Sequence, residues 1–179
     1  RDILPESGTD EFYLVSMCKD DRYVNQLTAD RLMQQLGVWH VELGTVSVRI
    51  DDVSQGFYLY TEVPDEEVRR DISRVRAVIR RRNDANREPA DPRWAHDDLA
   101  AAGVRYGDFL EAMRDLSGAE LVDALDGAMD LDQYLRWVAL MTLLGNGDYI
   151  DEVYFVAEES VDRAHRVIDY YTIHGWDPD

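Results

Sequence analysis

The 179-residue chain is predicted to adopt an α+β fold, on two observations. Apolar and polar residues alternate in two regions, 46–62 and 153–173, as they do in β-hairpins. In other regions, such as 29–36 and 131–144, apolar residues recur every three to four positions, as on the buried face of a helix. Because 45% of the residues are apolar, the chain can fill a core, and we expect a single domain over residues 1–179.

The net charge limits the classes of partner. The chain carries 19 Lys and Arg against 37 Asp and Glu, a formal charge of −18. This charge repels phosphate backbones and anionic lipids, so we expect no nucleic-acid partner and favour cations and basic proteins. No apolar run approaches the roughly 18 residues of a membrane helix, so no transmembrane segment is predicted. Cys18 is the single cysteine and cannot form an internal disulfide.

The first third of the chain predicts a strand, a helix and a hairpin. An apolar run at 12–17 predicts a strand, after which Asp20 or Asp21 can cap a helix that ends at Gly37. The buried stripe of this helix consists of Ala29, Leu32, Met33 and Leu36. The hairpin that follows joins an alternating strand up to Ile50 with a strand at 57–62, and its predicted turn residues are Asp51, Asp52, Gln55 and Gly56.

A second helix is predicted at 65–82. Acidic residues at 65–67 suit a helix start, and Val68, Ile72, Val75 and Ile79 form an apolar stripe. The other faces carry a local basic block, made of Arg69, Arg70, Arg74, Arg76, Arg80, Arg81 and Arg82. This block can form a groove for acidic or phosphorylated ligands, or a solvated face that neutralises nearby carboxylates, and the second interpretation is favoured.

Further helices and a hairpin are predicted beyond the polar connection at 83–92. Asp91 and Pro92 have the order of a helix cap and a first helical residue, and 106–116 is helical in pattern. Ser117 with Glu120, and Asp130 with Gln133, have the spacing of helix caps. The second pair opens an apolar helix at 131–144 that Gly145 ends, and a hairpin with strands at 153–156 and 167–173 follows.

Polar residues that could carry chemistry flank this last hairpin. Asn146 and Asp148 precede it, and Asp177 and Asp179 follow it. Because a hairpin returns its second end close to its first, we expect these side chains to meet. Their oxygen atoms suit Mg²⁺ or Mn²⁺ and are poor ligands for zinc. His174 is at best a supporting group here. The alternative is that these residues only form turns.

Four segments resemble the spore-coat protein H (CotH) kinase family. Residues 130–148 resemble its apolar helix followed by a Gly-Asn-x-Asp loop, and the Trp-Asp-x-Asp sequence at 176–179 also matches. Residues 55–62 resemble its glycine-aromatic strand ending in Glu, and 12–37 its strand, turn and amphipathic helix. Residues 63–129 show no such motif.

The resemblance implies a protein-kinase-like fold that transfers the γ-phosphoryl group of ATP, with Mg²⁺ or Mn²⁺, to Ser or Thr of a protein. Residues 1–62 would form part of the smaller lobe and the hinge, and 63–179 a mainly helical larger lobe with β-hairpins. Asp148 occupies the position of the catalytic Asp. Asp177, with Asn146 and Asp179, occupies metal-binding positions. Glu62 ends the strand that leads to the hinge, where adenine would bind, although it can equally be an exposed acid at a strand end.

Departures from the family pattern leave alternatives open. The family carries a phosphate-binding lysine on strands upstream of the matched region, whereas Lys19 is the single lysine here and lies in a predicted turn. We therefore expect a piece of a longer domain, truncated at one or both ends. The alternatives are a catalytically inactive kinase-like binding or surface module, and an acidic adaptor that docks through the basic block at 69–82. The family implies a basic or Ser-rich protein substrate and a spore-coat, secreted or surface location.

Overall fold

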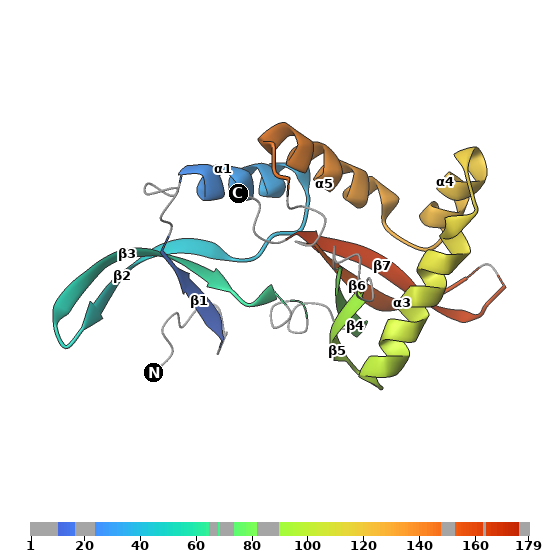
Figure 1. The fold of residues 1–179 in the computed structure, drawn as a ribbon, viewed down its shortest axis with the longest axis horizontal. Helices are drawn as coiled ribbons and strands as arrows, with labels where there is room; N and C mark the ends of the chain where they lie inside the picture. The colour runs from blue at the N-terminus through green and yellow to red at the C-terminus, as the bar shows by residue number, and fades with distance from the viewer. Residues whose placement is uncertain are drawn as a thin grey trace.

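The computed structural model describes residues 11–16, 24–64, 68, 74–81, 90–147, 153–162 and 164–175. In these residues the fold contains two antiparallel sheets and four helices (Figure 1). The predicted α+β class is therefore confirmed. None of the described helices has the length and apolar content needed to cross a membrane.

The first sheet has the strand order β1-β3-β2, with strands at Phe12–Val15 (β1), Leu43–Ile50 (β2) and Val53–Glu62 (β3). The predicted strand and hairpin are confirmed. Asp51 and Asp52 form the turn, with φ values of 49° and 65°, as a two-residue hairpin loop of type I′ requires. The predicted turn at Gln55 and Gly56 is wrong. Val48 pairs with Gly56 and Arg49 with Ser54, so Gln55 is the extra residue of a β-bulge within β3.

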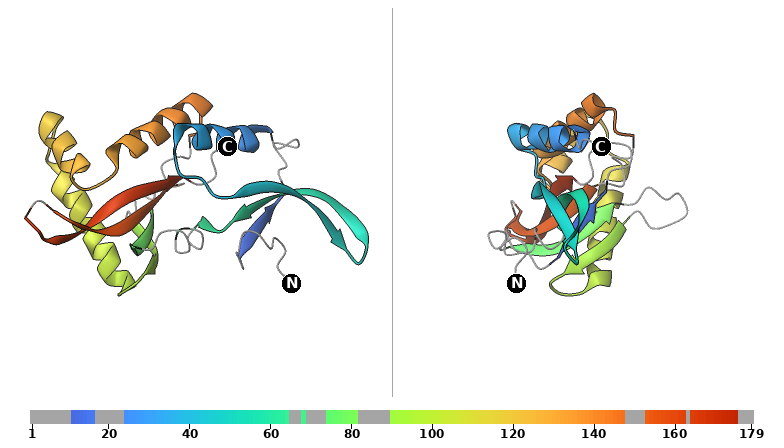
Figure 2. Two further views of the ribbon diagram at one scale, coloured as in Figure 1. Left: turned by 180° about the vertical axis from the view of Figure 1, so that it is seen from behind. Right: turned by 90° about the vertical axis from the view of Figure 1, so that its left-hand side faces the viewer.

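Helix α1 (Val24–Leu36) connects the first sheet to the rest of the molecule. Its buried side chains include Ala29 and Met33, two members of the predicted stripe, and Gly37 follows its last turn. Figures 1 and 2 show α1 running beside α5 (Leu131–Leu144). Arg136 of α5 donates to the carbonyl oxygen of Leu36 at 3.1 Å, which satisfies one of the carbonyl groups left free at a helix end. The predicted cap residues Asp20 and Asp21 lie outside the described residues.

The second sheet has the order β5-β4-β6-β7. Its strands are Ala90–Ala95 (β5), Val75–Arg81 (β4), Val153–Val161 (β6) and Val167–Gly175 (β7). The hairpin of β6 and β7 confirms the predicted pair of strands. The other two strands were not predicted.

The helix predicted at 65–82 is wrong at 75–81, which is the central strand β4. Val75, Ala77, Val78 and Ile79 are all buried, because β4 is covered on both faces of the sheet. A strand covered on both faces carries a continuous apolar run, which also satisfies helical spacing. Pairing with β6, which lies far along the chain, stabilises the strand over the helix. Of the remaining predicted helix, Val68 is described as helical and is 1% exposed, and Arg74 lies in a turn.

The predicted helix cap at Asp91 and Pro92 is also wrong, because both residues lie in β5, opposite Arg80 and Ile79 of β4. β5 is an edge strand, where a proline is tolerated because its missing N–H can face away from the ladder. The helix begins later, as α3 (Leu99–Arg114). Asp98 caps it by accepting from the N–H of Ala101 at 2.8 Å.

The main core lies between the second sheet and its helices. Helix α4 (Gly118–Asp126) follows α3, and α5 follows α4. One buried cluster joins α3, α5 and the sheet, and it also includes Met33 of α1 and Val38. Its largest members are Tyr106, Trp137 and Tyr171. The segment between β1 and β2, which contains α1 and Val38, is therefore anchored in this core.

Of the two predicted helix caps at Asp130 and Ser117, the structure shows the capping hydrogen bond only at Asp130. Asp130 accepts from the N–H of Gln133 at 2.9 Å, whereas the Ser117 side chain makes no cap hydrogen bond. We expect Asp130→Ala to lower the free energy of unfolding by about 1 kcal/mol. Ser117→Ala, the matched control, should change it by less than about 0.5 kcal/mol. Urea titration of both variants checks this, and equal losses would contradict it.

Candidate functional site

The candidate site is built on the open end of the hairpin formed by β6 and β7. The two strands, each nine residues long, pair in register from Val161 opposite Val167 to Val153 opposite Gly175. The chain therefore enters and leaves the hairpin at one end, as the sequence argument requires. Asp148, Asp177 and Asp179 lie outside the described residues, so their convergence stays a prediction.

Asn146 is the predicted site residue that is described at this end of the hairpin. It is 8% exposed and follows α5, which Gly145 ends with a left-handed φ of 70°. This conformation favours glycine and turns the chain so that the Asn146 N–H donates to the carbonyl oxygen of Met141 at 3.1 Å. The Asn146 amide nitrogen lies 3.8 Å from the Met141 sulfur. The residue is thus held at a defined place, and an amide oxygen is a ligand type that Mg²⁺ accepts.

Glu62 is not the exposed acid that one interpretation predicted. It is the last residue of β3, it is 0% exposed, and its N–H donates to the carbonyl oxygen of Glu42 at 3.2 Å. Phe12 of β1 is its partner across the ladder. Fully buried carboxylates are rare because removing them from water is unfavourable. Burial at the end of the first sheet agrees with a structural or binding role for Glu62, and its place beside adenine stays a prediction.

His174 of β7 lies in a buried position. Its ring packs on Trp39 with a centroid distance of 4.1 Å, and it is 2% exposed. Nε2 lies 3.4 Å from the Thr172 hydroxyl, and Nδ1 has no hydrogen-bond partner among the described residues. Burial lowers the pKa of His174 from 6.5 to about 3, so the imidazole is neutral at neutral pH. Sequence analysis did not identify Trp39 as its neighbour, because the contact joins residues far apart in the chain.

Gly175 ends β7 at a point where no side chain fits. A Cβ atom there would lie 2.7 Å from Trp137 Nε1 and 3.4 Å from the terminal methyl of Met33. Glycine is therefore required by the close approach of α5 and α1, and the last residue of β7 is held between these two helices. No pattern in the sequence identified this contact.

Over the described ranges, no group of three or more His, Cys, Asp or Glu side chains is gathered as a metal site would need. The carboxylates predicted to bind the metal lie outside those ranges, while Asn146 lies within them. The predicted set of carboxylate and amide oxygens fits a hard divalent cation by its chemistry.

The comparison with family models decides the family. The model described as CotH kinase protein matches residues 3–179. The chain belongs to this family. The match confirms the resemblance carried by residues 12–37, 55–62 and 130–148, and it includes residues 63–129, where we found no motif. Among curated proteins, none gave a significant match.

In this CotH family member, the contact at Gly175 can be tested directly. Gly175→Ala should lower the free energy of unfolding by about 1–3 kcal/mol, because the added methyl group overlaps Trp137. Gly44→Ala in β2 is the matched control, since its Cβ would have no neighbour within 4 Å. Denaturant unfolding measures both. A Gly175→Ala protein as stable as Gly44→Ala would show that the approach is not tight.

The buried His174 predicts a pH dependence of stability. The unfolded chain binds a proton at this residue near pH 6.5, and the native chain does so only near pH 3. The contribution of His174 to stability is thus complete above about pH 6.5 and declines as the pH falls toward 3. Between about pH 7 and pH 4 we expect a loss of about 3 kcal/mol that His174→Phe, which keeps a ring against Trp39, does not show. Urea unfolding across this pH range measures the free energy of unfolding of the native sequence and of His174→Phe. An equal loss in both proteins would contradict the prediction.

Proposed function

We propose that the chain is the core of an atypical protein kinase that transfers the γ-phosphoryl group of ATP to Ser or Thr of a protein substrate. The observation that carries the proposal is the family match over residues 3–179. The family description supports kinase-type chemistry in general. The nucleotide, the metal and the acceptor residue are the proposed details.

The arrangement of elements supports a division into two lobes. We assign residues 1–62 to part of the smaller lobe and the hinge, because a strand, a helix and a hairpin follow one another there. We assign residues 63–179 to the larger lobe, which contains α3, α4 and α5. The four-stranded sheet belongs to the same lobe, so this lobe is less helical than the sequence predicted.

The proposed site residues have distinct tasks. Asp148 orients the acceptor hydroxyl and takes its proton, while Asp177, with Asn146 and Asp179, binds the metal. Mg²⁺ or Mn²⁺, when bound, neutralises charge on the nucleotide phosphates. The buried Asn146 supplies a fixed amide, and Gly175 fixes the strand end from which the chain continues to Asp177. Positioning of this kind accounts for most of the rate in phosphoryl transfer.

A catalytically inactive kinase-like binding or surface module is the second candidate. The observation that favours it is Lys19, the single lysine of the chain, which does not lie in a strand pattern. Lys19 is outside the described residues. Kinases place a lysine against the nucleotide phosphates, and this sequence contains no lysine besides Lys19. Nucleotide binding and transfer therefore have to be measured separately.

Thermal unfolding with Mg²⁺-ATP tests the nucleotide site. At about a hundred times its dissociation constant, a ligand stabilises the native state by roughly 2.7 kcal/mol, which raises the melting temperature by several degrees. We expect this shift in the native sequence and in Asp108→Ala, an exposed residue of α3, and no shift in Asp177→Ala. An equal shift in all three would exclude Asp177 as a ligand.

Transfer itself is tested with γ-labelled ATP and a basic, Ser-rich peptide. Asp148→Asn should reduce the rate by a factor of about 10²–10⁴, because the acceptor hydroxyl loses its base, while circular dichroism stays unchanged. A nucleotide shift without any transfer in the native sequence would favour the binding module. Full activity in Asp148→Asn would refute its catalytic role.

A further inference from the structure

The outer edge of β7 is bound by the segment that begins α5. β7 is an edge strand of the second sheet, so the N–H groups on its free side need partners outside the sheet. The Tyr171 N–H donates to the Ala128 carbonyl oxygen at 2.9 Å, and the Tyr171 carbonyl oxygen accepts from the Asp130 N–H at 2.9 Å. Two residues further along the same side, the Ile173 N–H donates to Gln133 Oε1 at 3.0 Å. These bonds join the start of α5 to the free edge of β7.

The Gln133 side chain does not make the bond that its spacing predicts. Asp130 and Gln133 have the spacing of a capping box, in which the glutamine reaches back to the N–H of the cap residue. In the structure that N–H donates to Tyr171, and Gln133 reaches across to β7. The other half of the box remains, because Asp130 accepts from the Gln133 N–H. The Gln133 carboxamide therefore fixes the strand and not the helix end.

β7 runs beside α5 in the same direction (Figures 1 and 2). Gln133 binds Ile173, and four residues later Trp137 lies against Gly175, two residues further along the strand. Four helical residues advance about 6 Å and two strand residues about 6.6 Å, so the helix and the strand advance at nearly the same rate. The bond at Gln133 and the contact at Trp137 therefore fix one common register of β7 along α5.

This register relates the two elements that lead to the proposed metal site. Met141, one turn beyond Trp137, accepts from the Asn146 N–H at 3.1 Å, so α5 holds Asn146 in place. Asp177 follows β7 in the sequence and lies outside the described residues. The position of β7 along α5 thus sets where the chain leaves the strand toward Asp177, relative to Asn146.

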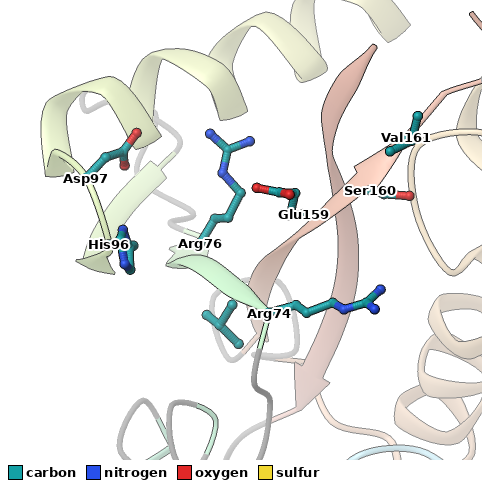
Figure 3. A pocket seen from close by; sticks show the side chains of 8 residues that line it. Arg74, Arg76, His96, Asp97, Glu159, Ser160 and Val161 are labelled. Atoms are coloured by element: carbon teal, nitrogen blue, oxygen red, sulfur yellow. The ribbon is translucent and has the colours of Figure 1, made fainter. Parts of the chain in front are cut away.

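The first half of β7 is held independently of Gln133. The Asp169 side chain is 6% exposed, and it contacts Arg76 of β4 at 2.7 Å and Arg105 of α3 at 2.8 Å. Figure 3 shows Arg76 extending from β4 toward α3, beside a hollow that it lines. For Arg76, the prediction that the basic block neutralises nearby carboxylates is confirmed. Because Asp169 lies four residues before Ile173, loss of the Gln133 bond loosens the last residues of the strand and leaves its first half in place.

We propose that Gln133 is a positioning residue of the proposed metal site, which sets the end of β7 relative to Asn146. It acts through the Ile173 backbone and touches neither metal nor nucleotide. The inference rests on the proposed function, because the ligands that it positions are those assigned to phosphoryl transfer. A misplacement of about 1 Å, caused far from the reacting atoms, can lower a rate by about 10²-fold. One hydrogen bond that fixes the strand register is therefore sufficient to affect the site.

Matched variants separate positioning from stability. Gln133→Met keeps the length of the side chain and removes the acceptor, whereas Gln133→Glu keeps an acceptor oxygen. Asp130→Ala weakens the start of α5 and leaves the bond to Ile173 intact. The measured quantity is the Mg²⁺ concentration that gives half of the ATP-induced rise in melting temperature, at one fixed ATP concentration. We expect it to rise at least fivefold in Gln133→Met and to stay within twofold of the native value in the other two variants.

Hydrogen exchange measures the cause without nucleotide. The Ile173 N–H should exchange at least tenfold faster in Gln133→Met than in Asp130→Ala, because only the first variant removes its acceptor. A general loss of stability would speed exchange in both variants alike. Equal exchange rates would show that Gln133 does not hold the strand, and would overturn the proposal.

The positioning role and the nucleotide site fail in different ways. An unchanged Mg²⁺ concentration in Gln133→Met, or an equal rise in Asp130→Ala, would overturn the positioning role and leave the nucleotide site standing. The absence of any Mg²⁺-ATP shift in the native sequence would refute the nucleotide site, and the positioning role with it.

Discussion

The antiparallel ladder between β6 and β7 is the interaction on which the rest of the structure depends. Residues 153–157 of β6 are all buried, and Tyr171, Ile173 and His174 of β7 are buried beside them. β4 adds to the other edge of β6, and α3 and α5 contribute side chains to the core on this sheet. Full burial of each large apolar side chain contributes about 1.5–3 kcal/mol, so this region supplies much of the stability. The same ladder places Val153 opposite Gly175 at the open end of the hairpin.

The core and the candidate site share side chains. Trp137 belongs to the main buried cluster and also leaves no room for a side chain at position 175. Met33 brings α1 to the same point, and Trp39 packs on His174 one residue before Gly175. A displacement of α1 would therefore disturb the end of β7. The segment that joins β1 to β2 is coupled in this way to the end of β7.

The elements that the sequence predicted correctly are those whose signals are local. Asp130, Gln133 and Gly145 lie within or next to α5 and define its ends whatever surrounds it. The hairpins were predicted because alternation and turn residues lie within a few positions of one another. β4 was misassigned since its partner in β6 lies far along the chain, and no local pattern separates a doubly buried strand from a helix stripe. For the candidate site, the hairpin topology was predictable and the burial of Glu62 was not. The close approach at Gly175 depends on packing between distant residues and could not be read from the sequence.

The position of β4 in its sheet sets an order for folding. β4 and β5 lie close in sequence, so they can pair with each other and pack against α3 early. β6 is synthesised about 70 residues later, an interval on the order of 10 s at typical rates of translation. During that interval one edge of β4 has no strand beside it, and Val78 and Ile79 lack the cover that β6 gives them in the finished protein. Closing such a long loop is slow, and an uncovered apolar edge promotes association with other chains. The newly made chain is thus most exposed to aggregation before the β6–β7 hairpin leaves the ribosome, and a chaperone that shields residues 75–81 would act at that stage.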